Sequence, residues 1–128
     1  MDISSLKILI AEDNQMNILL MKKLLAKWDI VPDFAANGME AVETFRSKSY
    51  NLILMDIHMP LLNGYEATEL IRNDADPIKA KTPIIALTAA VDSTIESEIK
   101  AAGLDDYIAK PFNAEELKQK LMVIADGL

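Results

Sequence analysis

Residues 51–60 of this 128-residue chain read NLILMDIHMP, and this stretch decides the expected fold class. Its first half is an almost continuous apolar run, and an acid, Asp56, follows the run directly. A short apolar run without polar alternation is typical of a strand that helices cover on both faces. Similar runs occur at KILIA (7–11) and PIIAL (83–87), so the sequence predicts a buried parallel sheet.

Helical segments alternate with strand candidates five times along the chain. The strands are predicted at Leu6–Ala11, Val31–Ala36, Leu52–Met55, Pro83–Leu87 and Asp106–Ala109. The helices are predicted at Gln15–Trp28, Gly38–Lys48, Gly64–Arg72, Thr94–Ala102 and Ala114–Ala125. This alternation predicts right-handed crossovers and a doubly wound α/β fold. Pro32 falls within the second strand, and because proline is tolerated mainly on edge strands, it favours the strand order 2-1-3-4-5.

The predicted helices carry start signals and one apolar stripe. Four helix starts place Asn or Ser three residues before Glu, the capping-box spacing: Asn37/Glu40, Asn63/Glu66, Ser93/Glu96 and Asn113/Glu116. In the first helix, a turn of about 100° per residue predicts a sheet-facing stripe of Asn17, Leu20, Met21, Leu24 and Trp28. Leu19 then falls opposite the stripe, with Met16 at its flank.

Composition restricts the functional class. The chain is 51% hydrophobic and 26% charged, as expected for one globular domain over residues 1–128, with 1–5 and 126–128 as peripheral tails. Its 13 basic and 20 acidic residues give a net charge of −7, which argues against direct nucleic-acid binding. The lack of cysteine excludes disulfides and thiolate metal sites and fits a cytoplasmic location. Apolar runs all fall short of the ~20 residues of a membrane span, so no membrane contact is expected.

Polar and charged residues follow the predicted strands. Glu12 and Asp13 follow the first strand, Asp56 the third, Thr88 the fourth and Lys110 the fifth. Because parallel strands end at one edge of a sheet, and ligands bind there, we expect these side chains to lie together. Clustered carboxylates repel one another unless a cation joins them, and an oxygen-ligand site with retained waters suits Mg²⁺.

The same residue types suit phosphoryl chemistry. Phosphoryl transfer depends chiefly on positioning and on neutralising negative charge. A metal ion, the Lys110 ammonium and the Thr88 hydroxyl would surround one carboxylate at this edge. That carboxylate is itself able to act as a nucleophile and form an aspartyl phosphate.

Five motifs in order resemble the receiver domain of two-component response regulators, over essentially the whole chain. They are ILIAEDN (8–14), LILMDIHMP (52–60), NGYEAT (63–68), PIIALTA (83–89) and DDYIAKPF (105–112). The EDNQMN and MDIHMP segments look most like receivers attached to hybrid histidine kinases. The resemblance implies a flavodoxin-like, doubly wound (βα)5 fold that switches in a phosphorelay.

The resemblance also assigns roles to matching residues. It implies that Asp56 is the phosphoacceptor and that Asp13, Asp56 and the backbone carbonyl of His58 bind Mg²⁺. Glu12 would act on the metal through a coordinated water. Lys110 would pair with the phosphoryl oxygens, and the Lys110–Pro111 peptide bond is expected to be cis.

The remaining implied roles concern switching and partners. Thr88 and Tyr107 would move after phosphorylation. A histidine kinase or a histidine phosphotransfer domain would be the phosphodonor, docking on a surface that includes Met16, Leu19 and Pro111. The cognate donor, the downstream partner and a phosphorylation-dependent homodimer are left open. In the family, positions matching His58 and Ala90 influence phosphate loss, and neither carries an acid or amide that would orient water, so slow self-dephosphorylation is expected.

Simpler explanations and other functions stay open at this point. Asp13 alone would serve as a helix cap, and Leu19 as an ordinary surface leucine. A Mg²⁺-dependent aspartyl-nucleophile phosphatase would resemble a DxD arrangement, whereas this chain reads Asp56-Ile57-His58 and lacks the second acid. A degenerate receiver that serves only as an interaction module would not need Glu12 or Lys110.

Overall fold

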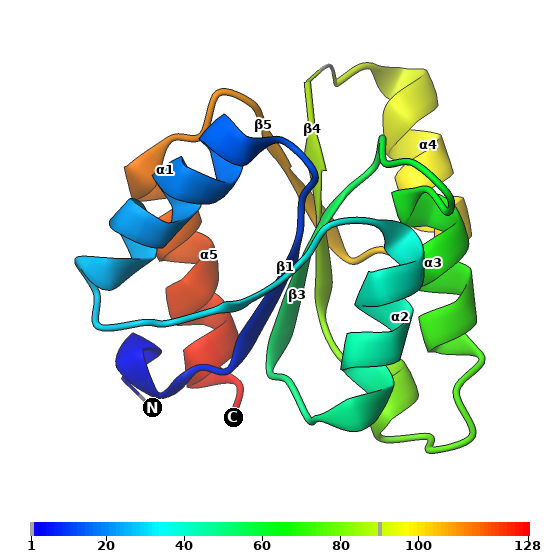
Figure 1. Cartoon of the computed structure of the whole chain (residues 1–128), viewed down its shortest axis with the longest axis horizontal. Coiled ribbons are helices and arrows are strands. Elements are labelled where there is room, and N and C mark those ends of the chain that lie inside the picture. Colours follow the sequence, from blue (N-terminus) through cyan, green and yellow to red (C-terminus); the bar gives the residue numbers. More distant parts are fainter. Residues whose placement is uncertain (1, 90) are drawn as a thin grey trace.

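A computed structural model describes residues 2–89 and 91–128, and its strands and helices alternate along the chain (Figure 1). The strands are β1 (Ile8–Ala11), β2 (Asp33–Ala35), β3 (Leu52–Asp56), β4 (Ile84–Thr88) and β5 (Asp106–Ala109). The helices are α1 (Gln15–Ala26), α2 (Gly38–Ser47), α3 (Gly64–Arg72), α4 (Ser93–Ala102) and α5 (Ala114–Asp126). Two short 3₁₀ helices, η1 (Ile3–Ser5) and η2 (Lys79–Lys81), complete the elements. Ala90 lies outside the described residues.

The five strands form one parallel sheet in the order β2-β1-β3-β4-β5, which confirms the predicted fold class and topology. The register places Ala11 beside Met55 and Thr88 beside Ala109. Since all pairs are parallel, the carboxyl ends of the strands meet at one edge of the sheet.

Helices cover both faces of this sheet. Helices α1 and α5 lie on one face, and α2, α3 and α4 lie on the other (Figure 1). Successive strand residues alternate between two buried clusters: Ile8 and Ile10 pack toward α1 and α5, whereas Leu9 packs toward the opposite helices. Burial on both faces is therefore the reason that the strand sequences lack polar alternation.

The helix starts agree with the predicted caps at three of four positions. Asn37, Asn63 and Asn113 each accept a hydrogen bond from the backbone N–H three residues later. The reciprocal contact from glutamate is present at Asn63, where Glu66 accepts from the Asn63 N–H. The Ser93 prediction is wrong: Asp92 is the cap, and its carboxylate accepts from the Ile95 N–H at 2.9 Å. Asp92 and Ser93 are adjacent and both are good capping residues, so the local sequence does not show at which of the two the helix begins.

The buried face of α1 and the extent of β2 also differ from expectation. Leu20, predicted to face the sheet, is 55% exposed, whereas Leu25 is fully buried with Met21. Apolar residues occur on every side of this helix, so a helical projection alone does not select the buried face. Strand β2 begins at Asp33, which places Pro32 before the strand rather than inside it.

Helix α3 begins close behind the end of β3. A Cβ atom on Gly64 would collide with the backbone carbonyl oxygen of Asp56 and lie 2.9 Å from the Ile57 Cα. The Gly64 N–H donates to the Ile57 carbonyl at 2.9 Å. Glycine at position 64 therefore permits the start of α3 to pack directly against the backbone of Asp56 at the end of β3. Within the described residues, every helix is too short or too polar to cross a lipid bilayer.

Candidate functional site

Three carboxylates meet where β1 and β3 end. Glu12 and Asp13 follow β1, and Asp56 is the last residue of the neighbouring β3. One carboxylate oxygen from each of these residues lies within 4.8 Å of the other two. Glu12 is fully buried and Asp56 is 5% exposed, whereas Asp13 faces solvent. The structure thus brings together the three acids that the sequence placed at this edge.

Lys110 adds a positive charge to these acids from the end of β5. Its Nζ lies 3.0 Å from Asp56 Oδ2, to which it donates a hydrogen bond, and 3.0 Å from Glu12 Oε2 in an ion pair. The Lys110 N–H also donates to the Thr88 carbonyl at 2.8 Å, which holds this residue against β4. The peptide bond between Lys110 and Pro111 is cis, as the family resemblance implied.

The surroundings shift the protonation of Asp56 and Lys110 in the same direction. Burial raises the pKa of the Asp56 carboxyl, and the negative charge of Glu12 raises it further, against hydrogen bonds from Lys110 and the His58 N–H. Burial opposes the charge on Lys110, but its contacts with Glu12 and Asp56 outweigh burial and raise the pKa of Lys110. Both shifts reflect a site with more buried negative charge than one lysine neutralises.

The chemistry of the donor set fits a divalent cation. Carboxylate oxygens of Glu12, Asp13 and Asp56 lie close enough to share one ion, and Asp13 opens the cluster to solvent. Hard oxygen ligands that are few in number and leave room for water suit Mg²⁺. The three carboxylates carry more negative charge than Lys110 neutralises, and a cation bound among them would neutralise the remainder.

Thr88 and Tyr107 lie on the adjacent strands β4 and β5. Thr88 ends β4 and is 2% exposed. Tyr107 is partly buried and points to α4, where its hydroxyl donates to Glu96 Oε1 at 2.8 Å. This hydrogen bond ties the Tyr107 side chain to α4, and its ring packs against the core beneath that helix.

The predicted docking residues are exposed beside the acids. Met16 is 67% and Leu19 47% exposed on the first turns of α1, and Leu20 extends this apolar surface. Pro111 is exposed on the segment after β5. His58 is also exposed, two residues beyond Asp56. All of these side chains lie outside the buried core.

The α1 N-terminus contains a contact that the sequence analysis missed. Asn14 caps α1 by accepting from the Asn17 N–H, so Asp13 is not the cap. Asn17 Nδ2 in turn donates to Glu12 Oε1 at 3.3 Å. The sequence placed Asn17 on the sheet-facing stripe but gave no reason to pair it with Glu12. The sequence signal for this contact was that Asn17 follows the capping residue Asn14 by about one helical turn, which places it near the start of α1.

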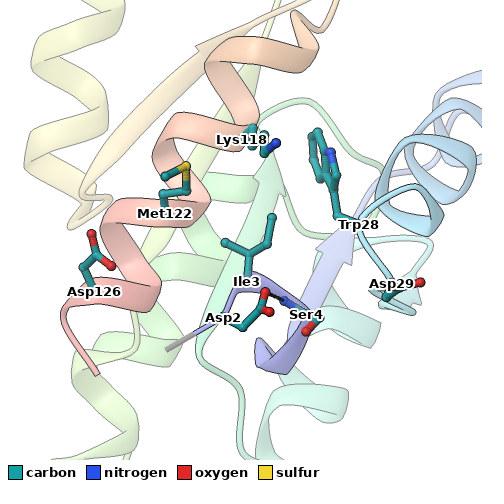
Figure 2. A pocket seen from close by; sticks show the side chains of 8 residues that line it. All are labelled: Asp2, Ile3, Ser4, Trp28, Asp29, Lys118, Met122 and Asp126. Atoms are coloured by element: carbon teal, nitrogen blue, oxygen red, sulfur yellow. Dashed lines mark hydrogen bonds between the residues drawn. The ribbon is translucent and has the colours of Figure 1, made fainter.

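A cavity of about 420 Å³ lies away from these acids (Figure 2). Its lining comes from η1, the turn after α1 and the outer side of α5: Asp2, Ile3, Ser4, Trp28, Asp29, Lys118, Met122 and Asp126. Ile3 also packs against the core between α1 and α5. None of these lining residues belongs to the acidic site, so the cavity is a separate feature of the molecule.

Comparison with known proteins decides the family. The family model described as the response regulator receiver domain matches residues 8–122. The chain belongs to this receiver family. Over 115 residues, the sequence of this receiver is 46% identical to that of hybrid signal transduction histidine kinase G of Dictyostelium discoideum. That alignment covers 88% of this chain and 3% of the relative.

Another histidine kinase and a solved receiver domain show the same relationship in sequence and structure. Probable histidine kinase 1 of Oryza sativa is 35% identical over 144 residues, covering 90% of this chain and 15% of the relative. This receiver thus spans only 3–15% of the length of these two curated relatives. The solved receiver domain of the Pseudomonas aeruginosa sensor histidine kinase PA1611, with a magnesium ion in its active-site cleft, is 36% identical. Its TM-score is 0.85, over 94% of this chain and 98% of that one.

A second solved structure involves a partner protein. The receiver domain of the Saccharomyces cerevisiae response regulator Ssk1, in complex with the histidine phosphotransfer signalling protein Ypd1, is 31% identical to this receiver. The TM-score is 0.82, and the alignment covers 91% of this chain and 86% of that chain. The receiver fold and family are therefore established for this chain by sequence and by structure.

Proposed function

We propose that this receiver accepts a phosphoryl group on Asp56 from a phosphohistidine, in a Mg²⁺-dependent reaction, and then signals onward in a two-component phosphorelay. The donor would be a histidine kinase or a histidine phosphotransfer domain. The observation that supports this best is the buried Asp56 carboxylate, flanked by Glu12 and Asp13 and contacted by Lys110. In this proposal the chain acts as a phosphoacceptor signalling domain that catalyses its own phosphorylation, rather than as an enzyme that turns over a substrate.

The proposed reaction uses Asp56 as the nucleophile. A carboxylate oxygen attacks phosphorus, and an O–P bond forms as the P–N bond to the donor histidine breaks and its electron pair returns to the ring nitrogen. Lys110, already 3.0 Å from Asp56 Oδ2, would donate to a transferred oxygen. Asp13 and Asp56, the His58 carbonyl and, through water, Glu12 would hold Mg²⁺, which supplies positive charge to the phosphoryl oxygens.

The proposed switch follows from the added charge. A phosphoryl group brings about −1.5 to −2 charges and three acceptor oxygens, which favours the conformer that supplies donors. The Thr88 hydroxyl, at the end of the strand next to β3, would be one such donor. Tyr107 would move inward into the space that Thr88 leaves, and this movement requires the hydrogen bond from Tyr107 to Glu96 to break.

The proposed donor surface consists of Met16, Leu19 and Pro111, and we include Leu20 in it because it is 55% exposed on the same helix. Their exposure beside the acidic site supports this assignment, because a phosphohistidine must approach Asp56 from the same edge. The Ssk1 receiver, similar in fold, forms a complex with a histidine phosphotransfer protein. The proposal includes a cytoplasmic location, in keeping with a sequence without cysteine.

Intact-mass measurement with a small phosphodonor tests the central proposal. Wild-type protein is expected to gain one phosphoryl group when Mg²⁺ is present and none when the metal is chelated. Asp56→Asn should gain none under either condition, because the nucleophilic oxygen is lost. Asp29→Asn, the same acid-to-amide change in the turn after α1, should gain the group as the wild type does. Failure of the wild type to gain it would instead favour a receiver that acts only as an interaction module.

We further propose that the phosphorylated form loses its phosphate slowly. His58 is exposed at the margin of the site, and its imidazole replaces the acid or amide that would orient an attacking water. Measuring phosphate loss from purified protein tests this, and His58→Asn is expected to shorten the lifetime. Rapid loss from the wild type that His58→Asn leaves unchanged would contradict the proposal.

A further inference from the structure

We infer that Asn17 is a positioning residue for metal binding: its carboxamide orients the buried Glu12 carboxylate toward the acidic site. This inference rests on the proposed Mg²⁺-dependent function and adds a residue to it. Within the described residues, the Asn17 side chain forms a hydrogen bond with Glu12 but none with Asp13 or Asp56, so it would act through Glu12.

The two oxygens of Glu12 have different surroundings. Glu12 Oε1 accepts from the Asn14 N–H at 3.2 Å and from Asn17 Nδ2 at 3.3 Å. Glu12 Oε2 lies 3.0 Å from Lys110 Nζ, and within the described residues it forms no hydrogen bond of good geometry. One oxygen is therefore tied to the start of α1, and the other is directed at Lys110 and available to the site.

The start of α1 fixes the position of Asn17. Asn14 Oδ1 accepts from the Asn17 N–H at 3.0 Å, so the cap sets the backbone of Asn17. From there the Asn17 side chain extends back to Glu12, which is fully buried and has three rotatable torsions. Without the Asn17 amide, Oε1 would keep a single backbone donor. The Glu12 carboxylate would then rotate more freely. A carboxylate without a fixed orientation forms a weaker hydrogen bond with a water molecule that is coordinated to the metal.

Metal affinity of the unphosphorylated domain provides the test. Mn²⁺ binding, followed by electron paramagnetic resonance, is expected to weaken about 10-fold in Asn17→Ala, the loss typical when a residue is removed from the hydrogen-bond network around a bound metal. Asn17→Gln keeps the amide donor and should recover part of the affinity. Circular dichroism and thermal melting should show both variants folded, because alanine and glutamine are good helix formers.

Two controls separate positioning from a general effect on the helix. Gln15→Ala removes an exposed amide from the same turn and should leave Mn²⁺ affinity unchanged. In a Glu12→Gln background, Asn17→Ala should cause little further loss, because two residues that act through one contact are not additive. The inference is overturned if Asn17→Ala binds Mn²⁺ like the wild type, if Gln15→Ala loses as much, or if the loss persists in the Glu12→Gln background.

These outcomes are distinct from a failure of the proposed function. A wild-type protein that accepts a phosphoryl group while Asn17→Ala retains full metal affinity overturns only the role of Asn17. A wild-type protein that binds Mn²⁺ through an Asn17-dependent site, yet accepts no phosphoryl group on Asp56, overturns only the acceptor function.

Discussion

Asp56 carries a charge that its surroundings disfavour. Burial and the nearby Glu12 raise the pKa of this carboxyl, so the folded protein holds the Asp56 proton more tightly than the unfolded chain does. Above that raised pKa, the ionised carboxylate lowers the free energy of unfolding. In metal-free buffer at neutral pH, Asp56→Asn is therefore expected to raise stability by about 1 kcal/mol. Thermal or urea melting of the two proteins measures this difference.

The pH dependence of this effect has a defined sign. As the pH falls through the raised pKa, wild-type Asp56 becomes neutral and its stability should approach that of Asp56→Asn. The gap between the two proteins is thus expected to be largest near neutral pH and to shrink in acid. Asp13→Asn, an exposed acid of the same cluster, should stabilise less because water screens its charge. A gap that widens in acid would contradict this account.

At the scale of elements, Arg72 joins helix α3 to its neighbours. Its guanidinium donates to the backbone carbonyls of Gly103, at the end of α4, and of Ala80 and Thr82, on either side of the end of η2, at 2.7–2.9 Å. It also pairs with Asp105, just before β5, at 2.9 Å. The arginine fork thus satisfies carbonyl groups at the chain reversal opposite the acidic site.

Arg72→Lys tests this junction. A lysine ammonium cannot reach the same acceptors in one plane, so the variant is expected to lose about 1–3 kcal/mol of stability. Urea unfolding measures the loss. Arg46→Lys is the matched control, because Arg46 is exposed and its side chain makes no hydrogen bond or ion pair with the described residues. Its stability should change by less than about 0.5 kcal/mol, and an equal loss in both variants would argue against the junction.

At the scale of the whole molecule, the acids and the exposed start of α1 share one end of the protein. Leu19 is 47% exposed there, whereas leucines such as Leu25 and Leu54 are fully buried in the core. If this surface binds the donor, Leu19→Lys should reduce phosphoryl transfer from a phosphohistidine protein about 10-fold, the effect of losing about 1.4 kcal/mol of binding at a central apolar contact. Transfer from a small phosphodonor should stay unchanged.

Transfer rates from both donors check the docking prediction. Leu70→Lys places the same charge on α3, where Leu70 is 41% exposed, and should leave both rates unaltered. An equal loss of both rates in Leu19→Lys would show damage to the acceptor site rather than to docking. No loss with the protein donor would contradict the assignment of this surface.

Much of the fold could be predicted because its signals are local. Apolar runs such as NLILM (51–55) identified the buried strands, and Asn37, Asn63 and Asn113 marked helix starts, since caps act on N–H groups within one turn. The errors have physical reasons as well. Adjacent cap-forming residues hid the role of Asp92, and the apolar residues on every side of α1 hid the exposure of Leu20.

The amino-acid sequence by itself determined the alternation of strands and helices, the strand order and the residues at the strand ends, Glu12, Asp13, Asp56, Thr88 and Lys110. Periodicity, capping and the geometry of parallel sheets act through near neighbours or through topology, so these properties can be read along the chain. Only the tertiary structure decided that Lys110 contacts both Asp56 and Glu12, that Asn17 donates a hydrogen bond to Glu12, and that Tyr107 donates one to Glu96. Those contacts depend on side-chain orientation and burial, which follow from how the layers pack against one another.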